Sequence, residues 1–259
     1  MTVEPKLLST APSDQNVLDL FKGEWSSRMP ADLGVTVQPG HAALFEDDRL
    51  QWANAVLGPL DGLDVLELGP LEGAHATMLE RFGAGSITAV EANPRAFLKC
   101  LCVKEIFGLQ RTRFKLGSFV PYLETCAPVD LVVACGVLYH MTDPLRLLEL
   151  ICAKADRIFL WTHVFDPALV AERDDRALFS APQALAGTPY RGVRRRYPEA
   201  AKSWRGFSGG ADAHAMWLER DSLLAYLRDK GYALTINFEE THHVNGPALA
   251  LCAQRRTTL

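Results

Sequence analysis

Strand-like and helix-like segments alternate along this chain from residue 63 onward. Helices are expected where apolar residues recur at helical spacing, over 71–83, 93–108 and 143–155. Short apolar runs between them are expected strands, at 63–69, 86–92, 112–118, 129–136 and 156–163. Alternation of this kind is typical of a mostly parallel sheet with helices on both of its faces. The chain is therefore expected to adopt an α/β fold.

The C-terminal part departs from this alternation. An amphipathic helix over 220–232 precedes two strand-like runs, "ALTINFEE" and "PALALCAQR", which are joined by "THHVNG". A short polar turn between two such runs predicts an antiparallel pair at the edge of the sheet.

Two regions lie outside the alternation. Residues 1–60 precede the first strand and carry one plausible helix, over 41–58, so we expect an N-terminal helical cap. Residues 164–219 form a long insert without strong periodicity, and such segments often cover a substrate. The expected organisation is a cap at 1–60 and a domain at 61–259 with a substrate-covering insert.

Bulk properties restrict the function further. The net charge of −4 gives no global reason to expect a nucleic-acid partner. No charged leader and no apolar run of membrane-spanning length is present, so we expect a cytoplasmic protein without a membrane partner. The six cysteines are scattered and form no C-x-x-C pair, which favours reduced, mostly buried thiols.

The first strand runs into a glycine turn with the sequence "VLELGPLEG", residues 65–73. Leu71 occupies the place of the middle glycine of a dinucleotide loop, and Glu72 begins the following helix. A carboxylate there would repel a phosphate, which argues against NAD, FAD or a nucleoside triphosphate. S-adenosylmethionine has no phosphate and carries an ammonium group, which Glu67 could hold. Glu91, at the end of the next strand, is spaced to bind ribose hydroxyls, although two solvated acids at strand ends are the alternative.

Residues 61–163 resemble the class I S-adenosylmethionine-dependent methyltransferases. The resemblance rests on "VLELGPLEG", "AVEANP", "LGSF" and "VDLVVACGVLYHMTDP". It implies a Rossmann-like, seven-stranded sheet with a reversed last hairpin, and S-adenosylhomocysteine as the product. The residues that it implies for cofactor binding are Glu67, Gly69, Pro70, Gly73, Glu91, Ala92, Asn93, Ser118, Phe119, Cys135 and Gly136.

Residues 94–145 resemble more closely the tRNA wobble-uridine carboxymethyltransferase branch, through "FLKCLCVKEIFG" and "GVLYH". That branch uses carboxy-S-adenosylmethionine, whose extra carboxylate needs a cationic partner. The helix before the first strand reads "ALFEDDRLQW" here, with Arg49 as its only base among three acids. Ordinary methyl transfer is therefore favoured over carboxymethyl transfer.

Candidate acceptor-side residues follow the fourth and fifth strands. Tyr139, His140 and His163 are the candidate catalytic residues, with His140 the most attractive base, because an acceptor hydroxyl needs one. A histidine bonded to the backbone beneath the loop is the structural alternative for His140. His163 and Asp166 could join His242 or His243 at a metal, but the spacing matches no metal motif, so no metal is expected.

The insert contains a basic run with interleaved aromatic residues, and His214 and Trp217 follow it as residues that either cap a pocket or pack. The run admits three interpretations: a solvated surface, a site for an acidic small molecule, or an RNA-backbone site. Its members are Arg191, Arg194, Arg195, Arg196, Tyr197, Lys202, Trp204 and Arg205.

The leading hypothesis is methyl transfer to a small-molecule acceptor such as a natural product, sugar or metabolite, at oxygen. A tRNA-modifying transferase and a non-catalytic S-adenosylmethionine-binding module are the alternatives, and the sequence leaves the oligomeric state open.

Overall fold

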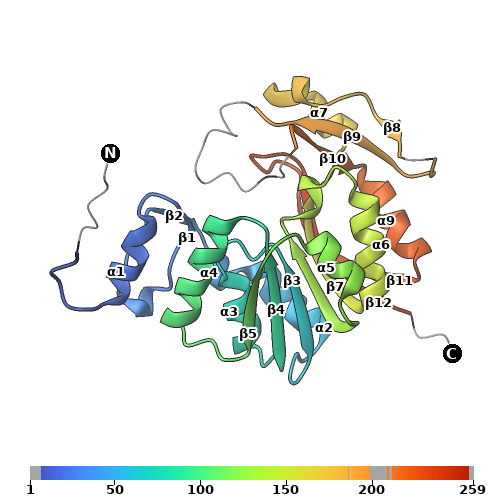
Figure 1. The fold of residues 1–259 in the computed structure, drawn as a ribbon. Helices are drawn as coiled ribbons and strands as arrows, with labels where there is room; N and C mark the ends of the chain where they lie inside the picture. The colour runs from blue at the N-terminus through green and yellow to red at the C-terminus, as the bar shows by residue number, and fades with distance from the viewer. Residues whose placement is uncertain (1–6, 186, 199–208, 210–211, 257–259) are drawn as a thin grey trace.

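A seven-stranded sheet forms the centre of the protein (Figure 1). The computed structural model describes residues 7–185, 187–198, 209 and 212–256. Along the sheet the strands are β11 (Tyr232–Glu240), β12 (Ala248–Arg255), β7 (Ala155–His163), β6 (Val129–Cys135), β3 (Asp64–Leu68), β4 (Ser86–Glu91) and β5 (Thr112–Leu116). Strand β12 is antiparallel to both of its neighbours, and the remaining pairs are parallel. The predicted fold class, with its reversed C-terminal hairpin, is confirmed.

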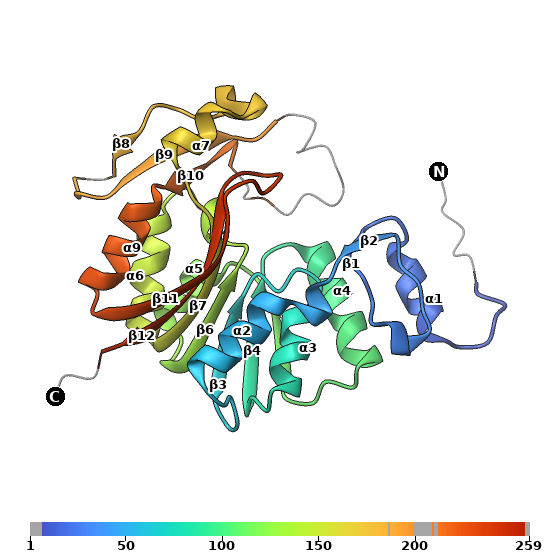
Figure 2. The same cartoon turned by 180° about the vertical axis from the view of Figure 1, so that it is seen from behind.

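Helices cover both faces of this sheet (Figure 2). On β6, Leu131 and Val133 belong to the core beneath α2 (Asp48–Leu57) and α3 (Ala74–Arg81). The alternate residues Val132 and Ala134 face the opposite core, because successive side chains of a strand point to opposite faces. That core lies beneath α5 (Phe119–Thr125), α6 (Pro144–Lys154) and α9 (Arg220–Asp229). Helix α4 (Pro94–Ile106) lies beside β5 and begins at the predicted cap, where Asn93 accepts from two backbone amides.

The N-terminal region is only partly helical. Besides α1 (Asp14–Leu18) and three 3-10 turns, it contains β1 (Trp25–Ser27) and β2 (Pro39–Ala42), which pair in parallel. The helix predicted over 41–58 begins only at Asp48, so the prediction was wrong for residues 41–47. Residues 39–42 form strand instead, and the side chain of Asp47 caps α2 by accepting from the Arg49 amide.

The insert folds into a small antiparallel sheet of its own. Its elements are α7 (Pro167–Ala171), η5 (Asp174–Leu178), β8 (Gln183–Ala184), β9 (Arg191–Arg196) and β10 (His214–Leu218). Strand β10 attaches this sheet to the domain, because the Met216 amide donates to the Met141 carbonyl and the Phe165 amide to the Leu218 carbonyl. The insert therefore lies over the end of the central sheet at which β6 and β7 finish (Figure 1). Lys202, Trp204 and Arg205 of the basic run fall outside the described residues.

Two further expectations concern the state of the cysteines and the presence of a membrane-spanning segment. All six cysteines are free thiols. No described helix combines the length and the apolar character that crossing a membrane requires.

Candidate functional site

A cavity of about 880 Å³ opens at the carboxyl ends of β3, β4, β6 and β7. Loops after these strands converge there, as is usual for ligand sites in open α/β sheets. The segment before α2 and the hairpin between β11 and β12 complete its wall. Nine of the predicted cofactor residues line it: Gly69, Pro70, Glu91, Ala92, Asn93, Ser118, Phe119, Cys135 and Gly136.

Glu91 joins two of the loops that border the cavity. One carboxylate oxygen accepts from the Leu71 amide at 3.0 Å and the other from the Asn93 amide at 2.8 Å. Burial raises the pKa of Glu91, and these backbone donors oppose that rise. A carboxylate can accept about four hydrogen bonds, so Glu91 keeps capacity for ligand hydroxyls.

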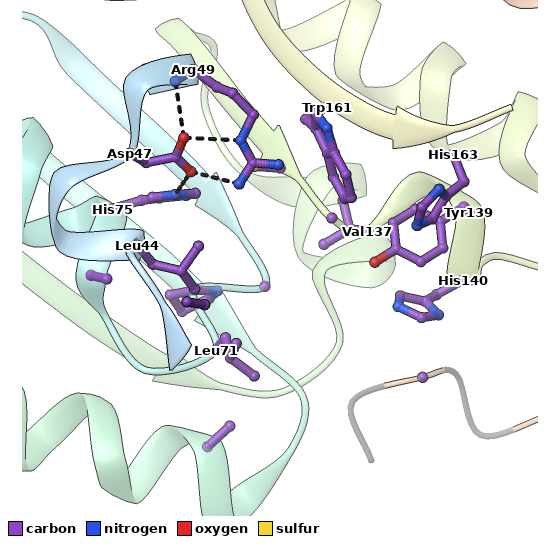
Figure 3. Close-up of a pocket in the computed structure, with 18 of the residues that line it drawn as sticks. Leu44, Asp47, Arg49, Leu71, His75, Val137, Tyr139, His140, Trp161 and His163 are labelled. Atoms are coloured by element: carbon purple, nitrogen blue, oxygen red, sulfur yellow. Dashed lines mark hydrogen bonds and ion pairs between the residues drawn. The ribbon is translucent and has the colours of Figure 1, made fainter. Parts of the chain in front are cut away.

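Leu71 adopts the backbone conformation that glycine would favour. Its φ is 56°, in the left-handed region, and its side chain lines the cavity (Figure 3). For an L-residue other than glycine this conformation costs about 1 kcal/mol. The loop therefore keeps the path of a glycine loop while adding an apolar side chain to the cavity wall.

Two predicted cofactor residues do not line the cavity. Glu67 is buried on the side of β3 that faces α3, where desolvation raises the pKa of its carboxyl to about 7. One of its oxygens has no hydrogen-bond partner among the described residues. Gly73 is a packing position: a Cβ added there would lie 3.0 Å from the Phe114 ring. The predicted direct contacts of Glu67 and Gly73 with a ligand are thus not seen in the lining of this cavity.

Glu72 does not line the cavity, so the interpretation of its charge as facing a ligand was wrong. It is fully buried and pairs with Lys99 at 2.5 Å. Its two oxygens also accept from the amides of Ser26 and Ser27, at 2.9 and 2.7 Å. The Glu72 side chain therefore connects β1 to the central domain by hydrogen bonds, and Lys99 neutralises the charge of the Glu72 carboxylate.

Asp47, Arg49 and His75 form a charged cluster on one wall of the cavity (Figure 3). His75 lies 2.8 Å from one Asp47 oxygen, and the Arg49 guanidinium donates to both oxygens at 2.9 and 2.6 Å. Burial alone would lower the pKa of His75, but the neighbouring Cys135 and Asp47 raise it to about 10. With both bases protonated the cluster carries a net charge of +1. The sequence indicated Arg49 as a lone base and did not indicate His75.

The three predicted catalytic residues lie together on the opposite side of Trp161 from this cluster (Figure 3). Tyr139 packs against both histidines, with ring centroids 4.1 Å from His140 and 4.5 Å from His163. Burial holds the pKa of Tyr139 well above its usual range, so its hydroxyl stays protonated. Burial and the nearby Arg195 lower the pKa of His140 to about 4, so its ring is neutral at pH 7.

Both histidine rings are oriented by neighbours. His140 Nδ1 lies 2.8 Å from the Tyr197 hydroxyl. His163 Nδ1 lies 2.9 Å from the Gly246 carbonyl, which requires that this nitrogen carries the hydrogen and leaves Nε2 with the lone pair. Its ring stacks on Trp217 at 4.9 Å and 7°. Burial and the adjacent His243 lower the pKa of His163 to about 3.

Two buried polar atoms on cavity-lining residues have no hydrogen-bond partner among the described residues. They are the donor Trp161 Nε1 and the acceptor Glu240 Oε2. Buried polar atoms are usually satisfied, so both are candidates for ligand contact. The sequence pattern could not single them out, because each sits in a strand that reads only as apolar or amphipathic.

The residues considered for a metal do not converge. Asp166 caps α7 by accepting from the Ala168 and Leu169 amides, and His242 is exposed outside the cavity lining. Only His163 and His243 come together, at 4.9 Å between ring centroids. His214 lies on β10 outside the cavity lining.

The described arginines of the basic run lie on β9 and divide between two faces. Arg191 is exposed and pairs with Glu219 at 3.2 Å, and Arg194 and Arg196 are exposed. Arg195 turns inward, with its guanidinium 4.9 Å from the Trp217 ring centroid. Trp217 is buried and packs beneath Arg195 and His163, so it is a packing residue.

Comparisons with known proteins agree with this geometry. No protein-family model matches the chain. The tRNA U34 carboxymethyltransferase of Chromohalobacter salexigens is 26% identical over 207 residues, covering 78% of this chain and 52% of that protein. The chain thus spans about half the length of the curated relative that it matches.

Solved structures give the fold. The N-terminal domain of EvdMO1, crystallised in the presence of S-adenosylhomocysteine and D-fucose, superposes with a TM-score of 0.72 at 22% identity, over 93% of this chain and 95% of that one. The magnesium protoporphyrin IX methyltransferase of Synechocystis PCC 6803, with bound S-adenosylhomocysteine, gives a TM-score of 0.54 at 15% identity, over 80% and 83% of the two chains. The chain therefore has the fold of the class I S-adenosylmethionine-dependent methyltransferases.

Proposed function

We propose that this protein transfers a methyl group from S-adenosylmethionine to a hydroxyl oxygen of a small-molecule acceptor. The observation that carries the proposal is one cavity that joins the predicted cofactor residues to Tyr139, His140 and His163. Its volume of about 880 Å³ is near the upper end for a ligand site, which suits a donor and an acceptor side by side. The neighbouring structure solved with S-adenosylhomocysteine and D-fucose supports a hydroxyl-rich acceptor.

The residues of the cavity fit the chemical groups of this donor. Glu91 has acceptor capacity for the ribose hydroxyls. The Asp47, Arg49 and His75 cluster, with its net positive charge, suits the methionine carboxylate. When bound, the sulfonium group supplies an activated methyl.

The acceptor is held on the side of Tyr139. Neutral His163 presents Nε2 as a hydrogen-bond acceptor for the attacking hydroxyl, with its ring fixed by the Gly246 carbonyl and by Trp217. His140, neutral and bonded to Tyr197, is the second candidate to receive the proton. An oxygen becomes acidic as it bonds to carbon, so a weakly basic imidazole is sufficient to take its proton. Trp161 Nε1 and Glu240 Oε2 gain partners if further acceptor hydroxyls bind there.

The test combines calorimetry with a turnover assay. We expect S-adenosylhomocysteine to bind, and radiolabelled methyl to pass from S-adenosylmethionine to members of a panel of hydroxylated sugars and aromatic metabolites. Acceptor-dependent release of S-adenosylhomocysteine is the readout. Binding without turnover on any acceptor pool would instead favour the non-catalytic binding module, and an absence of binding would contradict the proposal.

The second candidate is carboxymethyl transfer to a tRNA wobble uridine. Two observations favour it: the 26% identity to a tRNA U34 carboxymethyltransferase, and the second cation, His75, that lies beside Arg49 in the cavity. In the sequence, Arg49 is the only base of the segment "ALFEDDRLQW" before the first strand, and His75 joins it only in the folded protein. Both cations are bonded to Asp47, however, so only one net positive charge is available, and this matches the single carboxylate of the ordinary donor.

Unmodified tRNA with either donor separates the two candidates. If the protein transfers a carboxymethyl group to tRNA, digested tRNA will contain modified uridine. Its binding to tRNA will also weaken steeply between about 50 and 200 mM salt, because phosphate contacts release counterions. If tRNA binding is insensitive to salt, the hypothesis that the exposed arginines of β9 recognise RNA is ruled out.

A further inference from the structure

Strand β11 changes face shortly before its end. Leu234 and Ile236 pack against the core beneath α5, α6 and α9, whereas Phe238 packs against the opposite core, beneath α2 and α3. Phe238 has a φ of 51°, and this left-handed backbone is unusual for so bulky a residue. Strained backbone of this kind is concentrated at functional sites, and Glu240 lies just beyond it.

The irregularity is a β-bulge that selects which glutamate faces the cavity. Asn237 pairs with Ala250. The next pair joins Glu240 to Ala248, so β11 has one residue more than β12 between the two pairs. In a regular strand Glu239 would stand opposite Ala248. Because of the bulge Glu240 takes that place and lines the cavity, whereas Glu239 is exposed.

The Glu240 carboxylate lacks a partner that its surroundings would lead us to expect. The side chain is half-buried, and its Oε2 atom is buried without a hydrogen-bond partner in the described part of the chain. Arg49 lines the same cavity, but its guanidinium donates to both oxygens of Asp47. An unpartnered carboxylate oxygen away from water is costly, so a ligand that supplies the partner is expected to bind there.

We propose that Glu240 binds an ammonium group of the acceptor. The substrate class is then a hydroxylated amine, such as an amino sugar, and this assignment rests on the proposed methyl transfer. A hydroxyl could donate to the carboxylate, but only a cation also compensates its charge.

Glu240 lies in one row with a candidate base. It pairs with Ala248, and Ala248 pairs with His163, so the row crosses from β11 to β7. Neighbouring strands lie about 4.8 Å apart, which puts the backbones of Glu240 and His163 about 10 Å apart. Ala248 between them has only a methyl side chain. This spacing suits an acceptor about one ring in size, with its hydroxyl at His163 and its ammonium at Glu240.

The other groups of the cavity wall also suit a cation. Arg49 and His75 are both bonded to Asp47, and carboxylates outnumber them. Tyr139, Trp161 and Phe238 line the cavity too, and aromatic faces attract ammonium groups. An acidic acceptor would be repelled from such a wall. The carboxylates of the lining belong to Glu46, Asp47, Asp48, Glu91, Asp212 and Glu240.

The competing use of Glu240 is to hold the cationic groups of the donor. The predicted cofactor residues that line the cavity lie at the ends of β3, β4, β5 and β6. Glu240 ends β11, which is the edge strand beyond β7 and β12. The strand order therefore places Glu240 with the acceptor, and donor affinity is the measurement that separates the two uses.

Calorimetry on the protein saturated with S-adenosylhomocysteine tests the site. The probes are D-glucosamine and tyramine, each compared with its uncharged N-acetyl derivative. We expect an amine to bind about tenfold more tightly than its derivative, because a charge-assisted hydrogen bond is added. Glu240→Gln should abolish this ratio and leave the affinities for S-adenosylmethionine and S-adenosylhomocysteine unchanged. Glu239→Gln, which alters the exposed neighbour bonded to Arg220, is the matched control and should keep the ratio of the parent protein.

Thermal unfolding gives a readout that needs no ligand. Removing an uncompensated charge should stabilise the free protein, so Glu240→Gln should raise the Tm by about 2–4 °C. Glu239→Gln should not raise it, because that carboxylate already has a partner. A lower Tm for Glu240→Gln than for the parent would overturn the proposal.

The binding results separate this site from the reaction. Failure of both amines to bind, an unchanged ratio in Glu240→Gln, or weaker donor binding by that variant would each overturn the assignment. Equal methylation of amines and their N-acetyl derivatives would overturn it too, while the proposed methyl transfer would stand. Amine binding that depends on Glu240, without release of S-adenosylhomocysteine from S-adenosylmethionine, would establish the site and contradict the transfer.

Discussion

The carboxylate of Glu91 accepts a hydrogen bond from the amide of Leu71 at 3.0 Å, across 20 residues of sequence. This bond ties the loop after β3 to the end of β4, the two segments that border the proposed ribose site. Glu91 thus shapes the loop and offers acceptor capacity to a ligand at the same time.

Replacing Glu91 tests this double role. We expect Glu91→Gln to weaken S-adenosylhomocysteine binding by about 1–3 kcal/mol, because charge-assisted hydrogen bonds are lost. Calorimetry measures the effect, and Glu105→Gln on the exposed face of α4 is the matched control. Unchanged affinity in the Glu91 variant would refute the ribose assignment.

The left-handed backbone of Leu71 gives a second prediction. Leu71→Gly should be more stable to unfolding than Leu71→Ala by about 1 kcal/mol, since glycine removes the left-handed penalty and alanine retains it. Both variants delete the same apolar side chain beyond Cβ. Urea denaturation of the pair measures the difference, and equal stabilities would mean that the backbone at this position carries no strain.

The buried pair of Glu72 and Lys99 predicts a large loss of stability. We expect Lys99→Met to lower the free energy of unfolding by about 3 kcal/mol, because a buried carboxylate is left without its cation. The double variant Glu72→Gln/Lys99→Met should recover part of this loss. Arg146→Met, which breaks an exposed pair with Glu124, is the control and should unfold like the parent protein. A Lys99 variant as stable as that control would contradict a buried ion pair.

The depressed pKa values of His140 and His163 predict acid sensitivity. Both are neutral in the folded protein down to about pH 4 and 3, whereas an unfolded histidine protonates near 6.5. The unfolded state therefore binds more protons below pH 6.5, and stability falls as the pH is lowered. His163→Gln should remove about 2 kcal/mol of the loss between pH 6.5 and 5, at 1.36 kcal/mol per unit. Parallel pH profiles of unfolding for parent and variant would exclude a neutral buried His163.

His140 offers a kinetic test once an acceptor is known. We expect His140→Ala to lower kcat by about 10²-fold if this ring receives the proton, with S-adenosylhomocysteine affinity unchanged. His242→Ala, which changes an exposed histidine outside the cavity lining, is the control. Normal turnover by a folded His140 variant would leave it with the structural role of holding Tyr197.

Local pattern was sufficient for most of the fold. Strand and helix periodicity, together with caps such as Asn93, depends on neighbours a few residues apart, so the predicted strands and helices between residues 63 and 163 lie close to their observed bounds, although the short helix α5 was not predicted. Periodicity did not predict β2 (Pro39–Ala42), because these four residues form a strand only by pairing with β1, and the local sequence does not indicate this pairing. In the insert, short strands at the edges of a small sheet left too little periodicity to detect.

The residues of the candidate site likewise divide into those that the sequence could indicate and those that it could not. Glu91 and the glycine turn could be recognised because the ends of adjacent parallel strands must meet at one edge of the sheet. Glu72 stands at a helix start, where a ligand-facing side chain was the natural inference, but its partners Lys99, Ser26 and Ser27 are 27 to 46 residues away.

The sequence by itself determined the α/β order, the reversed hairpin and the loops that border the cavity, because these follow from periodicity and from the geometry of parallel strands. Only the tertiary structure decided which charges face the cavity. Asp47, Arg49, His75 and Cys135 converge from segments distant in sequence, and the neighbours that this brings to His75 raise its pKa against the effect of burial. Charge state depends on distance and desolvation in three dimensions, and the order of residues along a chain does not record either.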